Sequence, residues 1–101
     1  MVTIQNYVRA KSLEEAYELN QKKGNCILGG MLWTKMQNRM IQTAIDLCDL
    51  GLNEIEETEE EFLIGAMVSL RQLETDAGLN AYTQGAVRDA VKDIVGVQFR
   101  N

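Results

Sequence analysis

The first third of the chain has the pattern of a strand followed by an amphipathic helix. Val2–Gln5 alternates apolar and polar residues, as a strand at the edge of a sheet does. Ser12 and Glu15 have the spacing of a capping box, which predicts that a helix begins after Ser12, and Gly24 is placed to end it. The apolar face expected for this helix consists of Leu13, Ala16 and Tyr17.

A second strand and a second helix are predicted on either side of a pair of glycines. Cys26–Leu28 is short and apolar throughout, which is typical of a strand covered on both faces. After Gly29 and Gly30 the spacing becomes helical, with apolar residues at Leu32, Trp33, Met36 and Met40. Thr43–Leu47 returns to strand character. Because parallel strands need a connection of about a dozen residues or more, the spacing of these strands predicts a small parallel sheet.

The pattern changes after Gly51, where a hairpin is predicted. Asn53–Glu57 and Glu61–Ala66 have the character of two strands, and the acidic segment Thr58–Glu60 lies between them. The acidic residues are spread along the predicted strands and turn, and they lack the alternating oxygen ligands of a calcium-binding loop. We therefore interpret them as the solvated face of an antiparallel hairpin.

Helices are predicted for the remainder of the chain. Ser69 and Gln72 form a second capping box, opening a short helix that Asp76 and Gly78 end. The apolar face of a final helix consists of Ala86, Val87, Ala90, Val91 and Ile94. The order of elements predicts an α+β fold: a β-α-β-α-β lobe over residues 1–50, then an antiparallel hairpin and helices over residues 51–101.

Length and charge restrict the class of protein. A chain of 101 residues has room for one domain with a modest core. Its formal net charge of −5 leaves no basic surface for nucleic acid. No apolar run is long enough to span a membrane, and Gln5, Asn6 and Arg9 interrupt the segment where a signal peptide would lie. We expect a cytoplasmic protein with neither a nucleic acid nor a membrane as partner.

The residue types present restrict the chemistry further. The sequence contains no histidine, which excludes Ser-His-Asp and Cys-His nucleophiles and histidine-ligated metals. Cys26 and Cys48 are in no CxxC arrangement, and we interpret both as small buried hydrophobic residues. No convincing catalytic side chain or metal site is found, so we do not expect the isolated chain to be an enzyme by itself.

Four segments, in this order, carry a resemblance to a known family: Leu28–Gly30, Ala44–Leu47, Phe62–Leu70 and Val97–Asn101. The series resembles the FAD-binding domain of molybdopterin-dependent dehydrogenases, which includes the flavin subunits or domains of xanthine and carbon monoxide dehydrogenases. The resemblance implies a two-lobed fold with FAD between the lobes. It also implies electron transfer from a molybdopterin and iron–sulfur partner to an acceptor such as NAD or a quinone.

The resemblance places the cofactor on the diglycine segment. In the family this turn and the helix after it bind phosphate, which assigns FAD binding to Leu28, Gly29, Gly30, Met31, Leu32 and Trp33. Glycine suits the turn because a Cβ atom would block the approach of the diphosphate to backbone N–H groups. The alternative is a tight turn without a ligand. We expect Trp33 and the methionines at 31, 36 and 40 to lie in the core rather than against a flavin.

Two departures from the family pattern leave the function open. Met31 and Leu32 stand where the family has a hydroxyl and a polar residue, and the chain stops at Asn101, before the family's second glycine-rich segment. We therefore expect a truncated domain whose last residues, Arg100 and Asn101, fray. A truncated domain would expose strand edges, which predicts a homo-oligomer, most simply a homodimer. The alternatives to an FAD-binding domain are a cofactor-free relic acting as an oligomerising or interaction module, and a domain for another nucleotide or phosphate.

Overall fold

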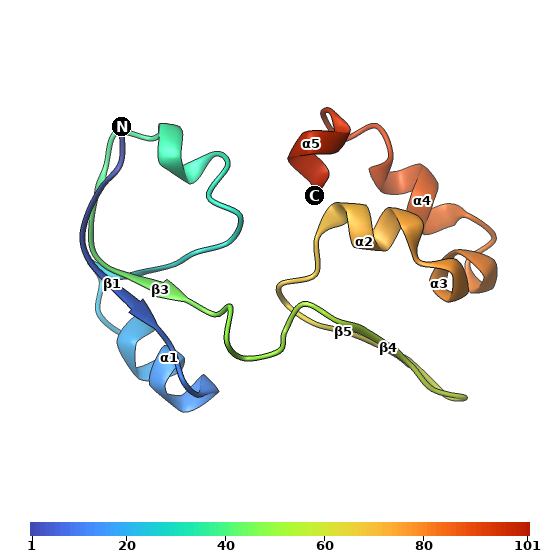
Figure 1. Ribbon diagram of the computed structural model, residues 1–101, viewed down its shortest axis with the longest axis horizontal. Coiled ribbons are helices and arrows are strands. Elements are labelled where there is room, and N and C mark those ends of the chain that lie inside the picture. The colour runs from blue at the N-terminus through green and yellow to red at the C-terminus, as the bar shows by residue number, and fades with distance from the viewer. The chain divides into compact units, whose positions relative to one another are not determined.

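The computed structural model describes residues 1–101, and the chain divides into two units, Met1–Gly51 and Leu52–Asn101 (Figure 1). Each unit contains its own sheet and its own helices. The prediction of an α+β fold with a parallel sheet followed by an antiparallel pair is confirmed. No helix has both the length and the apolar character needed to cross a membrane.

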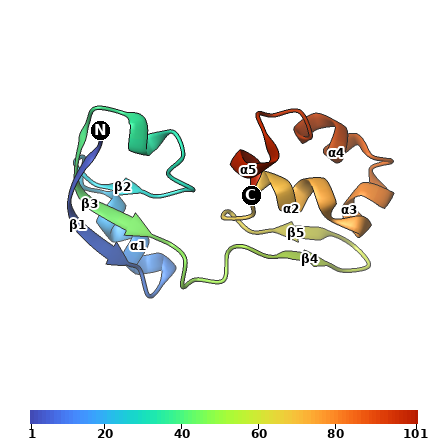
Figure 2. The same cartoon turned by 45° about the horizontal axis from the view of Figure 1, so that its top comes forward.

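The first unit is built on a three-stranded parallel sheet in the order β1-β3-β2 (Figure 2). Its strands are β1 (Thr3–Arg9), β2 (Cys26–Ile27) and β3 (Met40–Asp46). The central strand β3 pairs with both neighbours, so that Tyr7 and Cys26 both lie opposite Ala44. As predicted, the first strand is at an edge of the sheet. The second strand is also at an edge and Ile27 is exposed, so the expectation that it is covered on both faces is wrong.

The core of this unit lies around the central strand. Ile41, Ala44 and Ile45 are fully buried. Leu28 packs with Ile41 and Ala44, and the half-buried Met31 packs against this cluster. The parallel pairing thus places the central strand, which has the most neighbours, in the interior.

The helix α1 (Leu13–Asn20) connects β1 to β2 and begins where the sequence predicts. The Ser12 hydroxyl accepts a hydrogen bond from Glu15 N at 3.0 Å, while the Glu15 carboxylate accepts from Lys11 N rather than from Ser12 N. Ala16 is its one buried residue, whereas Leu13 and Tyr17 are exposed. The predicted apolar face is therefore wrong except for Ala16, because this short helix contacts the unit through a narrow strip.

The predicted helix after the glycines is absent. In its place is a single 3₁₀ turn, η1 (Thr34–Met36), and Met40 already belongs to β3. Tertiary pairing overrides the local periodicity here: Thr3 lies opposite Met40, and Thr3 N donates to Arg39 O at 2.9 Å. The loop before η1 runs away from the sheet and returns toward the N-terminus (Figure 2), where Val2 N donates to Lys35 O.

The second unit begins with the predicted hairpin. Its strands β4 (Ile55–Glu57) and β5 (Phe62–Ile64) are antiparallel, and the Thr58 hydroxyl accepts from Glu61 N across the tip. Gly65 follows the second strand and donates its N–H to Glu54 O at 3.0 Å. A Cβ atom at this glycine would overlap the carbonyl of Leu52, so the close approach of the two segments requires glycine.

Four short helices complete this unit: α2 (Leu70–Thr75), α3 (Ala77–Tyr82), α4 (Ala86–Val91) and α5 (Val97–Arg100). The capping box of Ser69 and Gln72 is confirmed. Asp76 ends α2 but also caps α3 by accepting from Leu79 N at 2.8 Å, so Gly78 lies inside a helix that the sequence did not predict. The predicted final helix is shorter than expected and excludes Ile94.

Two buried polar residues hold these helices together. The Asn80 side chain donates to the carbonyls of Leu73, Glu74 and Asp76 and accepts from Arg88 N, all within 3.1 Å. Arg100 is 8% exposed, and its Nε lies 2.8 Å from a Glu74 carboxylate oxygen. The expectation that Arg100 frays is therefore wrong, because this ion pair anchors α5 to α2.

Candidate cofactor-binding site

The diglycine segment lies at the carboxyl end of β2. Leu28, the residue after the strand, is buried and donates its N–H to Ile45 O at 2.9 Å, which fixes the start of the segment to β3. Gly29 and Gly30 follow and are exposed. In parallel sheets, ligands bind beyond the carboxyl ends of the strands. The segment assigned to FAD from the sequence thus begins at the edge where a ligand is expected.

Four consecutive backbone amides in this segment have no acceptor within the protein. The N–H groups of Gly29, Gly30, Met31 and Leu32 donate no hydrogen bond to another residue. Met31 has a φ of 61°, in the left-handed region. A change of backbone hand brings successive N–H groups to one concave side, an arrangement that binds anions. Since no helix follows, the loop itself supplies these donors.

The two glycines leave the approach to these amides open. Neither has a φ in the left-handed region, and a Cβ atom at Gly29 or Gly30 would meet no atom within 4 Å. The fold therefore does not require glycine at either position. A side chain there would instead extend into open space next to the free amides.

The charge around the segment is positive, although the chain as a whole is acidic. No acidic residue occurs between Glu18 and Asp46, whereas this stretch contains Lys22, Lys23, Lys35 and Arg39. Lys35 N donates to Met31 O at 3.0 Å, so Lys35 belongs to the turn that closes the loop. Neither Lys35 nor Arg39 takes part in an ion pair. Sequence reasoning missed this local excess of positive charge, although it can be counted directly in the sequence.

The apolar residues of the loop are less buried than predicted. Met31 and Leu32 are half-buried, whereas Trp33 is 61% exposed and Met36 is 69% exposed. Met40 is also exposed at the start of β3. The expectation that Trp33, Met36 and Met40 lie in the core is wrong, because the helix that would have aligned them does not form.

A polar cluster lies at the same carboxyl edge, at the ends of β1 and β3. The Tyr7 hydroxyl donates a hydrogen bond to the Asp46 carboxylate, which lowers the pKa of Asp46 and raises that of Tyr7. Arg9 pairs with Asp49 at 2.6 Å. Cys48 follows β3 and is exposed, contrary to prediction, and partial desolvation raises the pKa of its thiol; Cys26 is half-buried. The carboxylates of Asp46 and Asp49 are bonded to neighbouring side chains. We therefore interpret the cluster as stabilising the edge of the sheet and not as a catalytic site.

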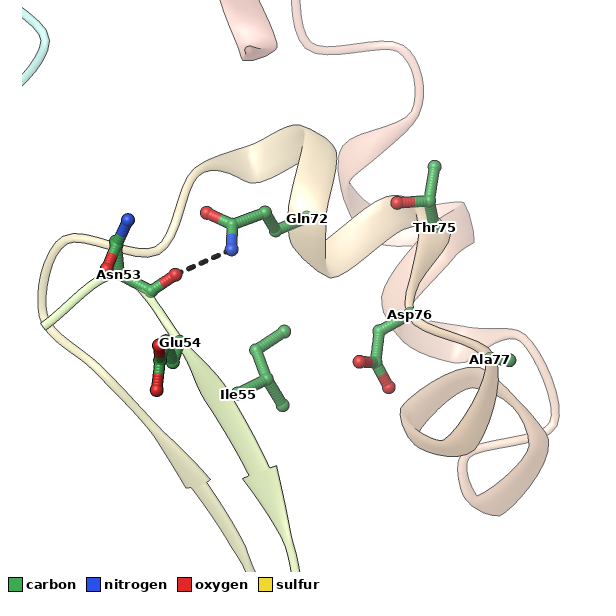
Figure 3. A pocket seen from close by; sticks show the side chains of 7 residues that line it. All are labelled: Asn53, Glu54, Ile55, Gln72, Thr75, Asp76 and Ala77. Atoms are coloured by element: carbon green, nitrogen blue, oxygen red, sulfur yellow. Dashed lines mark hydrogen bonds between the residues drawn. The ribbon is translucent and has the colours of Figure 1, made fainter. Parts of the chain in front are cut away.

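The second unit contains a polar cavity of about 530 Å³ between β4 and the α2–α3 junction (Figure 3). Gln72 Nε2 donates to Asn53 O at 2.7 Å, and its Oε1 accepts from Ser69 N. Asp76 faces the cavity but caps α3 (Figure 3). No group of three or more acidic or cysteine side chains is arranged to hold a metal ion. The side chains of Gln72, Thr75 and Asp76 are thus bonded within the fold.

Solved structures share this fold. A cyanide-inactivated Cu,Mo-CO dehydrogenase matches 99% of the chain with a TM-score of 0.79 and 24% identity. Quinoline 2-oxidoreductase from Pseudomonas putida 86 matches 98% with a TM-score of 0.80 and 18% identity. Carbon monoxide dehydrogenase from Hydrogenophaga pseudoflava, in a form lacking the Mo-pyranopterin moiety, matches 95% with a TM-score of 0.81 and 26% identity. The chain spans 36 to 37% of the length of these three chains.

The family comparison agrees with the resemblance that the four sequence segments carry. No curated protein matches the sequence. The family described as the FAD binding domain in molybdopterin dehydrogenase matches residues 2–101. The prediction from the sequence is confirmed, and the chain belongs to the family of FAD-binding domains of molybdopterin dehydrogenases.

Proposed function

We propose that this chain binds FAD through the segment Leu28–Trp33. The observation that carries the proposal is the run of free backbone N–H groups from Gly29 to Leu32. A diphosphate offers several oxygen acceptors and negative charge, which suits consecutive amides better than a single donor. The acid-free stretch around the loop adds favourable charge.

In this chain the backbone would bind the diphosphate, whereas in other members of the family polar side chains contribute. Met31 and Leu32 have no polar side chain to offer, so the amides of the loop donate the hydrogen bonds to the diphosphate. Lys35 and Arg39 neutralise part of its charge. The bound flavin would supply the electron-transfer chemistry, while the protein holds and orients it.

We further infer that the protein takes part in electron transfer from an iron–sulfur and molybdopterin partner to an acceptor. The support is the family to which the chain belongs and its likeness to CO dehydrogenase and quinoline 2-oxidoreductase structures. The partner subunits and the cytoplasmic location stay predictions.

The experiment is a titration of the 101-residue chain with FAD, followed by flavin fluorescence anisotropy and thermal shift, with FMN and ADP as comparison ligands. We expect saturable binding at micromolar affinity. Gly30→Val should abolish it without lowering the melting temperature, because the new side chain meets no protein atom but adds bulk within the run of free amides.

The control is Ala66→Val, which gives the same final side chain at an exposed position of the second unit. It should leave FAD binding unchanged. A folded wild-type chain that binds no FAD would overturn the proposed function.

A second candidate function is an oligomerising or interaction module without a cofactor. Exposed apolar side chains favour it: Leu13 and Tyr17 on α1, and Leu63 and Ile64 on β5. Such surfaces become buried when chains associate. The expected result is a homodimer by light scattering at tens of micromolar protein, and a monomer mass would contradict it.

A further inference from the structure

An exposed aromatic and thioether pair lies immediately after the free amides. Trp33 is the residue before η1, and Met36 is the last residue of that turn. Their side chains are 61% and 69% exposed. Large apolar groups exposed beside a run of polar donors are typical of the rim of a ligand site, where rings and polar groups are bound together.

The 3₁₀ geometry places these two side chains on one side of the turn. Met36 N donates to Trp33 O at 3.1 Å, the hydrogen bond of a three-residue turn. Side chains three positions apart are eclipsed in a 3₁₀ helix. Trp33 and Met36 therefore lie on the same side of the turn, and sulfur contacts with aromatic rings are favourable. We call Trp33 and Met36 the ring platform.

We propose that the ring platform stacks on one of the two ring systems of the dinucleotide whose diphosphate is held by the amides of Gly29–Leu32. This inference rests on the proposed function. In FAD, adenine and isoalloxazine are attached on opposite sides of the diphosphate, each through a sugar or ribityl chain. Trp33 directly follows the four residues Gly29–Leu32 in the chain, so a ring leaving the diphosphate on this side would meet the indole.

The test compares Trp33→Ala with wild type for FAD, FMN, ADP and inorganic pyrophosphate. Stacking on an aromatic side chain corresponds to an affinity change of about 5- to 100-fold on alanine substitution. We expect a loss of that size for FAD and none for pyrophosphate, which has no ring. A matching loss for ADP but not FMN assigns the stacked ring to adenine, and the reverse assigns it to isoalloxazine.

Two further variants separate stacking from a structural role. Trp33→Phe keeps an aromatic face and should retain most of the affinity, whereas Tyr17→Ala removes an equally exposed ring on α1 and should change nothing. Trp33 is the one tryptophan of the chain. If the stacked ring is the flavin, contact with the indole shortens the flavin excited-state lifetime and adds a long-wavelength charge-transfer band. Both signals disappear in Trp33→Phe.

Each outcome decides between the two claims. FAD binding that is equal in wild type and Trp33→Ala overturns the ring platform and leaves the amide site standing. An equal loss of FAD and pyrophosphate affinity in Trp33→Ala also overturns it, because the substitution would then act on the loop. No saturable FAD binding by the wild type removes the proposed function, and the ring platform falls with it.

Discussion

In the unit Leu52–Asn101, the buried polar side chains of Asn80 and Arg100 are bonded to neighbouring groups, whereas in Met1–Gly51 four consecutive backbone amides have no partner. Exposed backbone N–H groups can be satisfied by water, so free amides occur in the second unit as well, for example at Leu52–Glu54. What distinguishes the loop of the first unit is that its run of free amides lies in an acid-free stretch of the sequence, at the carboxyl end of a parallel strand. This combination supports the proposal that a ligand binds in the first unit.

Charge follows the same division. The first unit has six basic and five acidic residues, so it is close to neutral and contains the acid-free stretch. The second has four basic and ten acidic residues, with an acidic hairpin at β4–β5. An anionic cofactor is therefore attracted to the first unit more than to the second.

The largest effect that would sharpen this comparison is expected for Asn80→Ala. The substitution leaves several buried backbone groups of α2 and α4 without partners, which costs about 3 kcal/mol of unfolding free energy. Chemical denaturation would measure this loss, while FAD affinity should not change under conditions where the variant is folded. Asn38→Ala, at an exposed position, is the control; a similar loss there would break the assignment.

A pair of glycine substitutions is expected to give the next largest effect. Gly65→Ala forces a Cβ atom against the Leu52 carbonyl and should destabilise the chain by about 1 to 3 kcal/mol. Gly30→Ala meets no atom, so it should be neutral or slightly stabilising, since alanine restricts the unfolded chain. Thermal unfolding measures the difference. FAD titration should show the reverse order, with Gly30→Ala the weaker binder, and equal behaviour of the two variants in both assays would contradict the comparison.

The smallest effect concerns pH. The hydrogen bond from Arg100 holds the pKa of Glu74 below its usual range. A carboxyl group whose pKa is lower in the folded state stabilises that state above its unfolded pKa, and the contribution is lost as pH falls through the folded pKa. Wild type should therefore lose melting temperature in acid more steeply than Glu74→Gln. Glu59→Gln, on the exposed hairpin, should follow wild type, and parallel curves for all three proteins would contradict the role of this ion pair.

Several elements could be predicted because their signals are local. Ser12 and Ser69 mark helix starts through hydrogen bonds to residues three positions later. The hairpin is marked by strand character on both sides of Thr58–Glu60. The helix expected after Gly30 could not be excluded in this way. The helix does not form because Met40 pairs with Thr3 in the sheet. The local spacing of apolar residues gives no sign of this pairing, because Thr3 lies far from the segment in the sequence.

The sequence suggested which segment forms the candidate site, but not the conformation of that segment. The segment Leu28–Trp33 was identified from a family resemblance, and its role in binding FAD stays a proposal. Its donors were expected from a helix, and the exposed Trp33 was expected in the core. The anchoring of Arg100 was missed because its partner Glu74 lies 26 positions away.

The sequence by itself determined the family, the α+β class, the parallel and antiparallel pairings, and the position of the diglycine turn. The antiparallel pairing follows from contacts between near neighbours, while the parallel pairing follows from the order of the elements and the length of their connections. Only the tertiary structure decided that η1 replaces a helix, that the amides of Gly29–Leu32 have no partner, and that Arg100 is buried. The physical reason is that a hydrogen bond or burial between distant segments overrides local preference, and such contacts exist only once the chain has folded.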